Sequence, residues 1–258
     1  MAETSTYKRL KELVGKDTKN RFDFIEQETR ELGLNPKAYE LVSPRGTDRN
    51  LVVDFDYGNK SQLWLTANYD TFDKLPSANN NASGVIALLG LSETLREISL
   101  PVNIRLVYFD AGLDTDLIAR RRRNSDFVPG SEVFLQHMMD EETEFIDTYA
   151  GAIVIQAVGK GNLCVFERTG RKAENSEELN NKIRAQGRSQ GILVELKAQS
   201  PNADNTSFLK EGLQATVLAR YHEGSWHRMQ TQGDDLANVM PQTIDQTVEF
   251  LQGVIQNV

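Results

Sequence analysis

The sequence predicts an α/β protein in which a mainly parallel β-sheet is covered on both faces by helices. Two observations predict this class. Short apolar, strand-like runs alternate along the chain with segments of helical periodicity. The 258 residues are 39% hydrophobic and 26% charged, which suits one substantial core and excludes collagen-like, coiled-coil and fully disordered chains. Because no internal repeat and no long linker is visible, residues 1–258 are expected to form a single domain.

The N-terminal part of the chain, about residues 3–33, is expected to form two helices. Apolar side chains such as Leu10 and Leu13 recur at helical spacing, and Gly15 separates the two segments. Gly33 and the proline that follows shortly after it end the second helix.

The middle of the chain continues with strands and one long apolar helix. The expected elements are, in order, strands at 38–42, 50–55 and 62–67, a helix at 82–98 and a buried strand at 102–109. A turn at 57–60 separates the second and third strands.

The second half repeats this alternation after a polar connection at 110–130. The expected elements are a helix at 131–139, strands at 152–158 and 162–166, a helix at 176–186, strands at 192–196 and 215–219, and a closing helix at 243–255. In sheets of this kind ligands bind beyond the carboxyl ends of the strands, so polar residues at those ends are the candidate site.

Charge and cysteine content limit the partners. Because 29 basic and 37 acidic residues leave a net charge of −8, the chain is not expected to bind nucleic acid. No apolar run approaches the ~20 residues that span a bilayer, and no signal-like apolar stretch stands near the start. A single cysteine, Cys164, fits a reducing compartment, so a cytoplasmic protein without a membrane partner is expected.

Several segments share their order and spacing with one enzyme family. They are LWLTANYD at 63–70, SANNNASG at 77–84 opening an apolar helix, VYFD at 107–110, Gly130-Ser131, IVIQ at 153–156, NADN at 202–205 and Trp226-His227. From about residue 50 to the C-terminus the chain resembles the co-catalytic zinc aminopeptidases and glutaminyl-peptide cyclotransferases. The resemblance implies a three-layer α/β/α sandwich with a mixed, mainly parallel sheet, and release or cyclisation of an N-terminal residue.

The resemblance also implies which residues stand at the functional positions. In the family, two zinc ions are held by His, a bridging Asp, Glu, Asp and a final His, and a second Glu is the general base. By this correspondence Asn68 replaces the first His, Asn80 the bridging Asp and Gln156 the second Asp. The Glu pair falls on Gly112 and its neighbour, so that His227 alone is retained.

These replacements remove the chemistry on which the family depends. Zinc needs imidazole, thiolate or carboxylate ligands, and neutral amides are poor substitutes. Paired dications without anionic ligands would leave an uncompensated buried charge. With Gly112 at the base position, no group is placed to activate water, although Asp110 could stand in. No catalytic residue, metal ion or other cofactor is therefore expected.

The replacements keep polar, hydrogen-bonding side chains, which suggests an uncharged polar pocket for a small molecule or a peptide terminus. The alternative explanation is drift at positions that are no longer used. The expected pocket residues are Asn68, Asp70, Asn80, Asp110, Gln156, Asp204 and His227.

A run of four arginines, Arg120, Arg121, Arg122 and Arg123, stands out in an acidic chain. It is either a recognition element for a carboxylate or phosphate, which arginine binds through its planar fork, or a solvated loop.

Taken together, the residues predict an aminopeptidase-like protein that lacks catalytic activity and binds a small molecule, a peptide end or a protein partner. Two alternatives stay open. One is an active metal-dependent aminopeptidase or glutaminyl cyclase that uses zinc at a rearranged site around His227, Asp70, Asp110 and Asp204. The other is a structural partner in an assembly.

Overall fold

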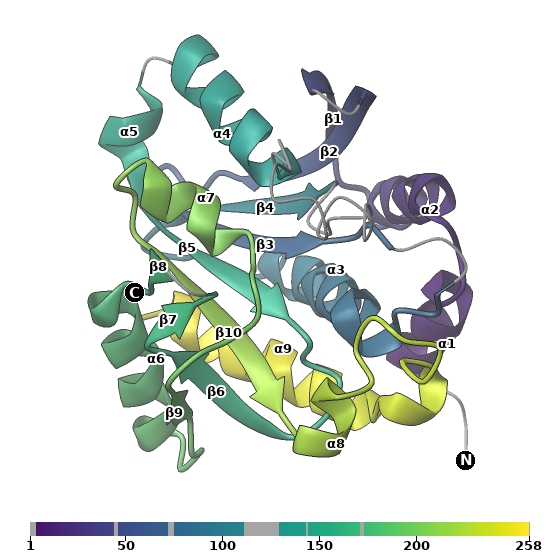
Figure 1. The fold of residues 1–258 in the computed structure, drawn as a ribbon. Coiled ribbons are helices and arrows are strands. Elements are labelled where there is room, and N and C mark those ends of the chain that lie inside the picture. Colours follow the sequence, from purple (N-terminus) through teal and green to yellow (C-terminus); the bar gives the residue numbers. More distant parts are fainter. Residues whose placement is uncertain are drawn as a thin grey trace, which may run out of the picture.

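The computed structural model describes residues 4–43, 46–71, 75–110, 129–142, 144–170 and 173–257. Within these ranges the strands form an eight-stranded sheet in the order β1-β2-β4-β3-β5-β10-β6-β9 (Figure 1). Its strands are β1 (Lys37–Ser43), β2 (Gly46–Phe55), β3 (Gln62–Asn68), β4 (Asn103–Phe109), β5 (Tyr149–Gln156), β6 (Asn162–Phe166), β9 (Glu195–Lys197) and β10 (Ala215–Tyr221). A separate small hairpin pairs β7 (Arg168–Thr169) with β8 (Ala173–Glu174).

The sheet is mixed, as the sequence predicts. β3 pairs in parallel with β4 and β5, β5 with β10, and β6 with β9. The pairs β1 with β2, β2 with β4, and β6 with β10 are antiparallel. The central strands β4, β3, β5 and β10 therefore run in one direction, and their carboxyl ends meet at one edge.

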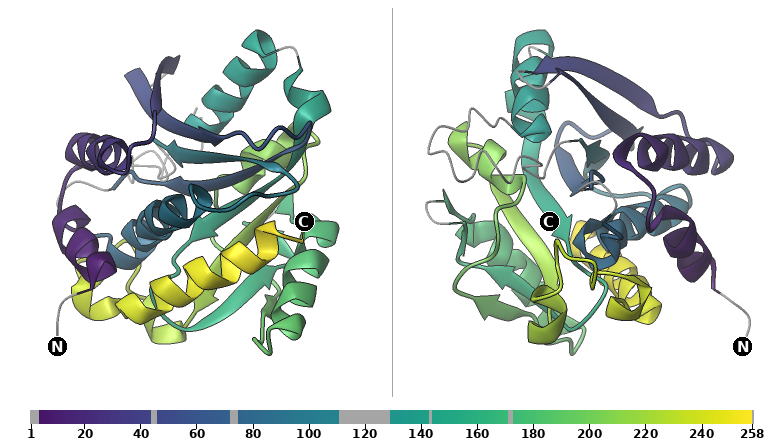
Figure 2. Two further views of the ribbon diagram at one scale, coloured as in Figure 1. Left: turned by 180° about the vertical axis from the view of Figure 1, so that it is seen from behind. Right: turned by 45° about the vertical axis from the view of Figure 1, so that its right-hand side comes forward.

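Helices cover both faces of this sheet (Figure 2). They are α1 (Ser5–Leu13), α2 (Thr18–Glu31), α3 (Ser83–Leu95), α4 (Gly130–Glu141), α5 (Phe145–Thr148), α6 (Glu177–Ser189), α7 (Asn205–Lys210), α8 (Glu223–Trp226) and α9 (Pro241–Ile255). On β3, Leu65 packs into the core beneath α3 and α9, whereas its neighbour Trp64 packs on the opposite face against Phe134 of α4. This alternation follows from the two-residue period of a strand.

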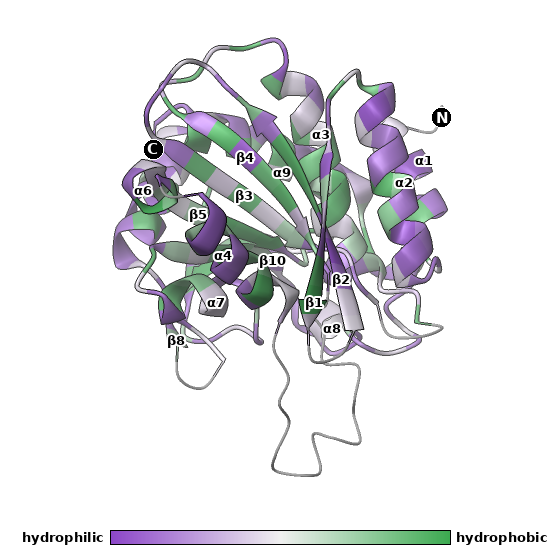
Figure 3. Ribbon diagram, turned by 90° about the horizontal axis from the view of Figure 1, so that it is seen from above, coloured by the Kyte–Doolittle hydropathy of each residue, from purple (hydrophilic) through white to green (hydrophobic). Residues whose placement is uncertain are grey.

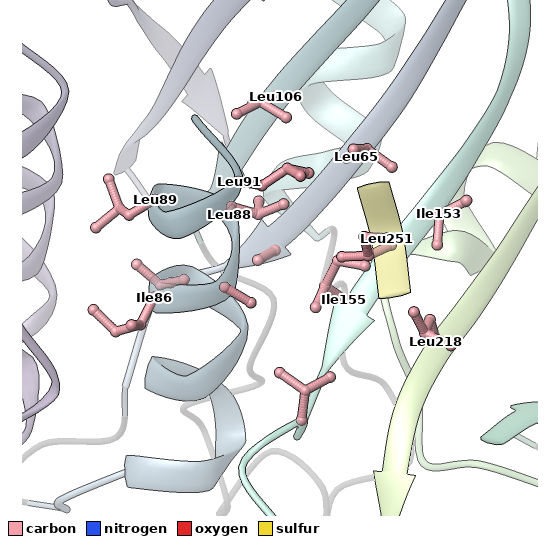
Figure 4. Close-up of a cluster of buried hydrophobic side chains, with 14 of the residues drawn as sticks. Leu65, Ile86, Leu88, Leu89, Leu91, Leu106, Ile153, Ile155, Leu218 and Leu251 are labelled. Atoms are coloured by element: carbon pink, nitrogen blue, oxygen red, sulfur yellow. The ribbon is translucent and has the colours of Figure 1, made fainter. Parts of the chain in front are cut away.

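The larger core lies between the sheet and α3. Leu88 and Leu91 of α3 meet Leu65 of β3, Ile155 of β5 and other aliphatic side chains, all buried (Figure 4). The helix is apolar around most of its circumference because α1, α2 and α9 pack on its remaining sides. Figure 3 shows the contrast between the apolar ribbon of α3 and the many hydrophilic residues of α2.

Local signals fix several helix ends. The Asp17 side chain accepts a hydrogen bond from the backbone N–H of Asn20 (2.8 Å) and caps α2. Pro241 occupies the first turn of α9, where its missing N–H has no cost.

No helix in the described ranges is both long enough and apolar enough to cross a bilayer.

Most predicted elements are present, with ends that differ by a few residues, but the strand expected at 192–196 is wrong. The strand in this region is β9, and residues 192–193 belong to the connection after α6. The N–H of Ile192 donates to the carbonyl of Gly187 (2.8 Å) and closes the end of α6. Leu193 is 74% exposed, so its apolar character does not reflect a buried strand. The short helices α5, α7 and α8 were not predicted.

Candidate functional site

The predicted amide residues meet at the carboxyl ends of two neighbouring strands. Asn68 ends β3, Gln156 ends β5, and these strands are paired in parallel (Figure 1). Asn80 lies in the turn Ala78–Ala82 that leads into α3, and its backbone there is not helical (φ −117°, ψ 89°). All three side chains are buried, which makes their hydrogen bonds decisive for the stability of this region.

The amide side chains are tied to one another and to the backbone. Asn68 Nδ2 donates to Asp70 Oδ1 at 2.9 Å. Asn81 Nδ2 contacts Asn68 Oδ1 (3.1 Å) and the carbonyl of Ile155 (2.9 Å). Gln156 Nε2 donates to Asn80 Oδ1 at 3.4 Å, which is a long hydrogen bond. Asn68 and Asn80 therefore use part of their hydrogen-bonding capacity within the protein.

One acceptor in this cluster has no partner. Gln156 Oε1 is buried and accepts no hydrogen bond from any residue that the structure describes. A buried polar atom without a partner costs about 1–3 kcal/mol, so such atoms are uncommon and often face a ligand or an ordered water molecule. This oxygen is the clearest sign that the cluster can accept a hydrogen bond from outside.

The turn that carries Asn80 is held by a carboxylate that the sequence did not single out. Asp234 accepts hydrogen bonds from the backbone N–H groups of Asn79 (2.9 Å) and Asn80 (3.0 Å) and from Asn238 Nδ2 (2.9 Å). Burial raises the pKa of Asp234, while these donors and the charge of Arg21 oppose that rise. No local pattern marks the link from Asp234 to the turn, because Asn79 and Asn80 lie more than 150 positions earlier.

A second buried carboxyl group, that of Asp204, interacts electrostatically with Asp70, the hydrogen-bond partner of Asn68. Asp204 is buried and accepts a hydrogen bond from Ser131 Oγ at 2.7 Å. Burial raises its pKa to about 7, and the negative charge of Asp70 acts in the same direction. At neutral pH this carboxyl group is therefore close to half protonated.

Arg21 supplies a buried positive charge on the other side of the cluster. Its guanidinium donates to the carbonyls of Pro76 (2.7 Å), Lys16 (3.1 Å) and Tyr69 (3.4 Å). Burial lowers the pKa of Arg21 to about 10, opposed by the charges of Asp70 and Asp234. The arginine thus partly balances these two carboxylates and holds the backbone that precedes the Asn80 turn.

The other predicted pocket residues are more widely spread. Asp110 follows β4, and its Oδ2 accepts from the backbone N–H of Arg49 at 3.1 Å. Its charge adds to the burial that raises the pKa of Tyr69, whose hydroxyl donates to the carbonyl of Arg49. His227 follows α8 and is exposed. Among the described residues, no hydrogen bond or ion pair joins His227 to Asn68, Asn80 or Gln156.

Two sequence-based predictions fall outside the described residues. They concern Gly112, at the position of the general base, and the arginine run 120–123. The remaining predictions on single residues can be compared with the structure. Cys164 is fully buried in β6, and burial raises the pKa of its thiol to about 12, as expected for a small apolar side chain rather than a nucleophile.

The described side chains at these positions do not suit paired zinc ions. Outside the segments that the structure leaves undescribed, no three His, Cys, Asp or Glu side chains are grouped so that they could hold a metal ion. Asn68, Asn80 and Gln156 offer neutral amide oxygens, and two of these already accept hydrogen bonds from neighbouring amides.

Comparisons with known proteins agree with this architecture. The model for peptidase family M28 matches residues 50–255. No curated protein sequence matches the chain. Among solved structures, a leucine aminopeptidase precursor from Bacteroides thetaiotaomicron shares 16% identity at a TM-score of 0.77, covering 98% of this chain and 96% of that one.

Two further structures are similar over nearly their full length. A glutaminyl cyclase from Bacteroides thetaiotaomicron, bound to N-acetylhistamine, shares 16% identity, covers 98% of this chain and 97% of that chain, and gives a TM-score of 0.76. A Zn-dependent exopeptidase from Parabacteroides distasonis shares 17% identity with the same coverage, 98% and 97%, at a TM-score of 0.73. At such low identity the likeness establishes the fold.

Proposed function

The chain belongs to peptidase family M28, and from this premise we propose that it is a catalytically inactive member that binds a peptide N-terminus or a similar amine at the ends of β3 and β5. The observation that carries the proposal is the buried, unpartnered Oε1 of Gln156, next to Asn80. An N–H group of a ligand would satisfy this acceptor.

The chemistry of the cluster argues against hydrolysis. Asn68, Asn80 and Gln156 carry no charge and cannot replace water around zinc as imidazole or carboxylate does. The side-chain oxygens of Asn68 and Asn80 already accept hydrogen bonds from Asn81 and Gln156. We therefore assign the site to binding, and we derive no catalytic step through a metal ion.

The charges near the cluster favour an amine over a neutral ligand. Asp204 has a pKa of about 7, so a nearby ammonium group would favour its carboxylate form. The affinity for such a ligand should rise as the pH increases toward about 7 and should fall again above about 8, where the N-terminal ammonium group loses its proton. Two of the proteins of similar fold are a leucine aminopeptidase precursor and a glutaminyl cyclase, and both names refer to N-terminal residues.

Binding is tested with a dipeptide that carries a free N-terminus and with its N-acetylated form, by calorimetry. We expect the free dipeptide to bind more tightly, and the variant Gln156→Met to weaken it about 5- to 10-fold through loss of one acceptor. Gln136→Met is the matched control, because Gln136 is exposed on α4. Equal affinity of the parent and Gln156→Met would contradict the proposed contact.

Inactivity is tested separately by metal analysis and turnover. Gently purified protein should contain far less than one zinc ion per chain, and added zinc, cobalt or manganese should not produce cleavage of aminoacyl anilides or cyclisation of N-terminal glutamine. Stoichiometric zinc together with turnover would instead support the rearranged active site.

The location and the wider partners of the protein rest on sequence alone. We propose a cytoplasmic location because a single buried cysteine requires no oxidising compartment. The arginine run 120–123 stays a proposed contact for an anionic partner group.

A further inference from the structure

A cavity of about 520 Å³ lies away from the candidate site, between β6, β10, α9 and the connection after α6. Figure 2 shows α9 running beside α6 on this face of the sheet. None of Asn68, Asn80 and Gln156 lines the cavity. Its volume lies within the range of small-molecule sites, so the chemistry of its walls decides what it could hold.

A buried cation forms part of the wall. Arg220, near the end of β10, is only 7% exposed. Its Nε donates to Thr247 Oγ1 (2.9 Å), and one terminal nitrogen donates to the carbonyl of Gly161 (2.8 Å). The other terminal nitrogen reaches Gln246 Oε1 only at 3.5 Å, the limit for a hydrogen bond.

The charge of Arg220 is not matched by an acid. A guanidinium has five N–H groups, and the described residues accept from three of them, one weakly. Among the described residues no carboxylate lies within ion-pairing distance of Arg220, and burial lowers its pKa to about 10. A buried cation with free donors attracts an anion, and a carboxylate matches the guanidinium fork.

Another part of the lining is apolar, and it begins with Leu163, the cross-strand neighbour of Arg220. Leu163 and Phe250 are buried there, whereas Ile192 is 37% exposed and Leu193 is 74% exposed. These two side chains stand on the same connection that was expected to be a strand. Because apolar side chains stand beside a buried cation, the pocket favours a ligand that carries an apolar group and an anionic group.

We infer that this cavity binds a carboxylate that carries a neighbouring apolar group, as found in a leucine-like amino acid, either free or N-acylated. The carboxylate lies on Arg220, and the apolar group packs between Phe250 and Leu193. Glu249 also lines the cavity and is exposed, so it can attract the ammonium group of a free amino acid. The inference does not depend on the function proposed for the other site.

The direct test is calorimetric titration with N-acetyl-L-leucine, L-leucine and N-acetyl-L-leucinamide. We expect saturable binding of at least one carboxylate, with the amide bound at least about tenfold more weakly because it cannot pair with Arg220. If N-acetyl-L-leucine binds more tightly than L-leucine, the ligand is an N-acylated amino acid. The reverse order indicates a free amino acid. No saturable binding by either one, or equal binding of the amide, would overturn the inference.

Substitutions of residues in the cavity test whether the ligand binds there. Leu193→Asp adds a repelling charge at an exposed position and should weaken binding of N-acetyl-L-leucine at least about tenfold. Ile146→Asp is the matched control, because Ile146 is 60% exposed on α5 and lies outside the cavity. An unchanged affinity in Leu193→Asp would also overturn the inference.

Arg220→Gln should abolish binding of the carboxylates. Because Arg220 also holds the carbonyl of Gly161, circular dichroism must show that this variant is folded. If Arg220→Gln is not folded, the Leu193→Asp variant provides the test instead. The candidate-site variant Gln156→Met should bind N-acetyl-L-leucine as the parent does, which separates the two sites experimentally.

Discussion

At the scale of single residues, the candidate site is governed by which polar groups are satisfied. Asn68 and Asn81 form hydrogen bonds with each other and with neighbouring groups, whereas Gln156 keeps one buried acceptor without a partner. Burial raises the pKa of Asp204 to about 7. The hydrogen bond from Ser131 opposes this rise only in part. The two groups in this region that are best able to interact with a ligand are therefore the side-chain oxygen of Gln156 and the carboxyl group of Asp204.

Asp204 makes stability depend on pH. Its pKa is raised in the folded protein, so its contribution is fully present below pH 4 and is lost as the pH rises through about 7. Relative to Asp204→Asn, the parent should therefore lose a few kcal/mol of unfolding free energy over this range, because each pKa unit is worth about 1.4 kcal/mol. Urea unfolding of both proteins at several pH values measures the difference, and a constant difference would contradict the raised pKa.

At the scale of elements, the entry into α3 brings the cluster together. Gly84 stands at the start of this helix, where an added Cβ would lie 2.6 Å from the carbonyl oxygen of Ile155 on β5. The same Cβ would lie 2.5 Å from Asn81 Oδ1. The missing side chain at this position lets α3 approach β5 closely enough for Asn81 to reach across to Asn68.

Gly84→Ala should destabilise the protein by about 1–3 kcal/mol, because the Ile155 carbonyl belongs to the backbone of a central strand and cannot move aside easily. Gly90→Ala in the same helix is the control. Its Cβ would meet only a Val248 methyl group, at 3.3 Å, and alanine favours the helix. Thermal unfolding of the two variants should differ clearly, and an equal effect would mean that the contact with β5 can relax.

At the scale of the whole molecule, the fold of the family persists while its residues differ. The chain keeps a TM-score of 0.77 to an aminopeptidase precursor with 16% identity. Such folds depend on apolar patterning and layer packing, which many sequences satisfy. The chemistry depends on a few side chains at the sheet edge, so it can change without loss of the scaffold.

Restoring the family's imidazole and carboxylate side chains tests whether the metal site can change while the scaffold is kept. The triple variant Asn68→His, Asn80→Asp, Gln156→Asp should be less stable than the parent without metal, because it adds buried carboxylates close to Asp234 and Asp70. Added zinc should raise its melting temperature by mass action and should leave that of the parent unchanged. A zinc-dependent shift of the same size in the parent would show that the amides do hold the metal.

Sequence patterns account for most of the fold because they report local requirements. The mainly apolar run at 62–67, buried on both faces of the sheet, and the apolar length of α3 can be read without a structure. The failure at 192–196 has a physical reason, since apolar residues in a short run look alike whether they enter a strand or line a cavity. Asn68, Asn80 and Gln156 were grouped by the family resemblance, and in the structure Asn68 and Gln156 end paired parallel strands while Gln156 contacts Asn80.

The sequence by itself determined the α/β class, the order of most elements and the amide character of the candidate site. Only the tertiary structure decided that Asp234 holds the Asn80 turn, that Gln156 Oε1 has no described partner, and that Arg220 and Phe250 line one cavity. These features arise between residues that are far apart in the chain. Local periodicity determines which face of an element is buried, but only packing determines which distant groups share that burial and which remain unpaired.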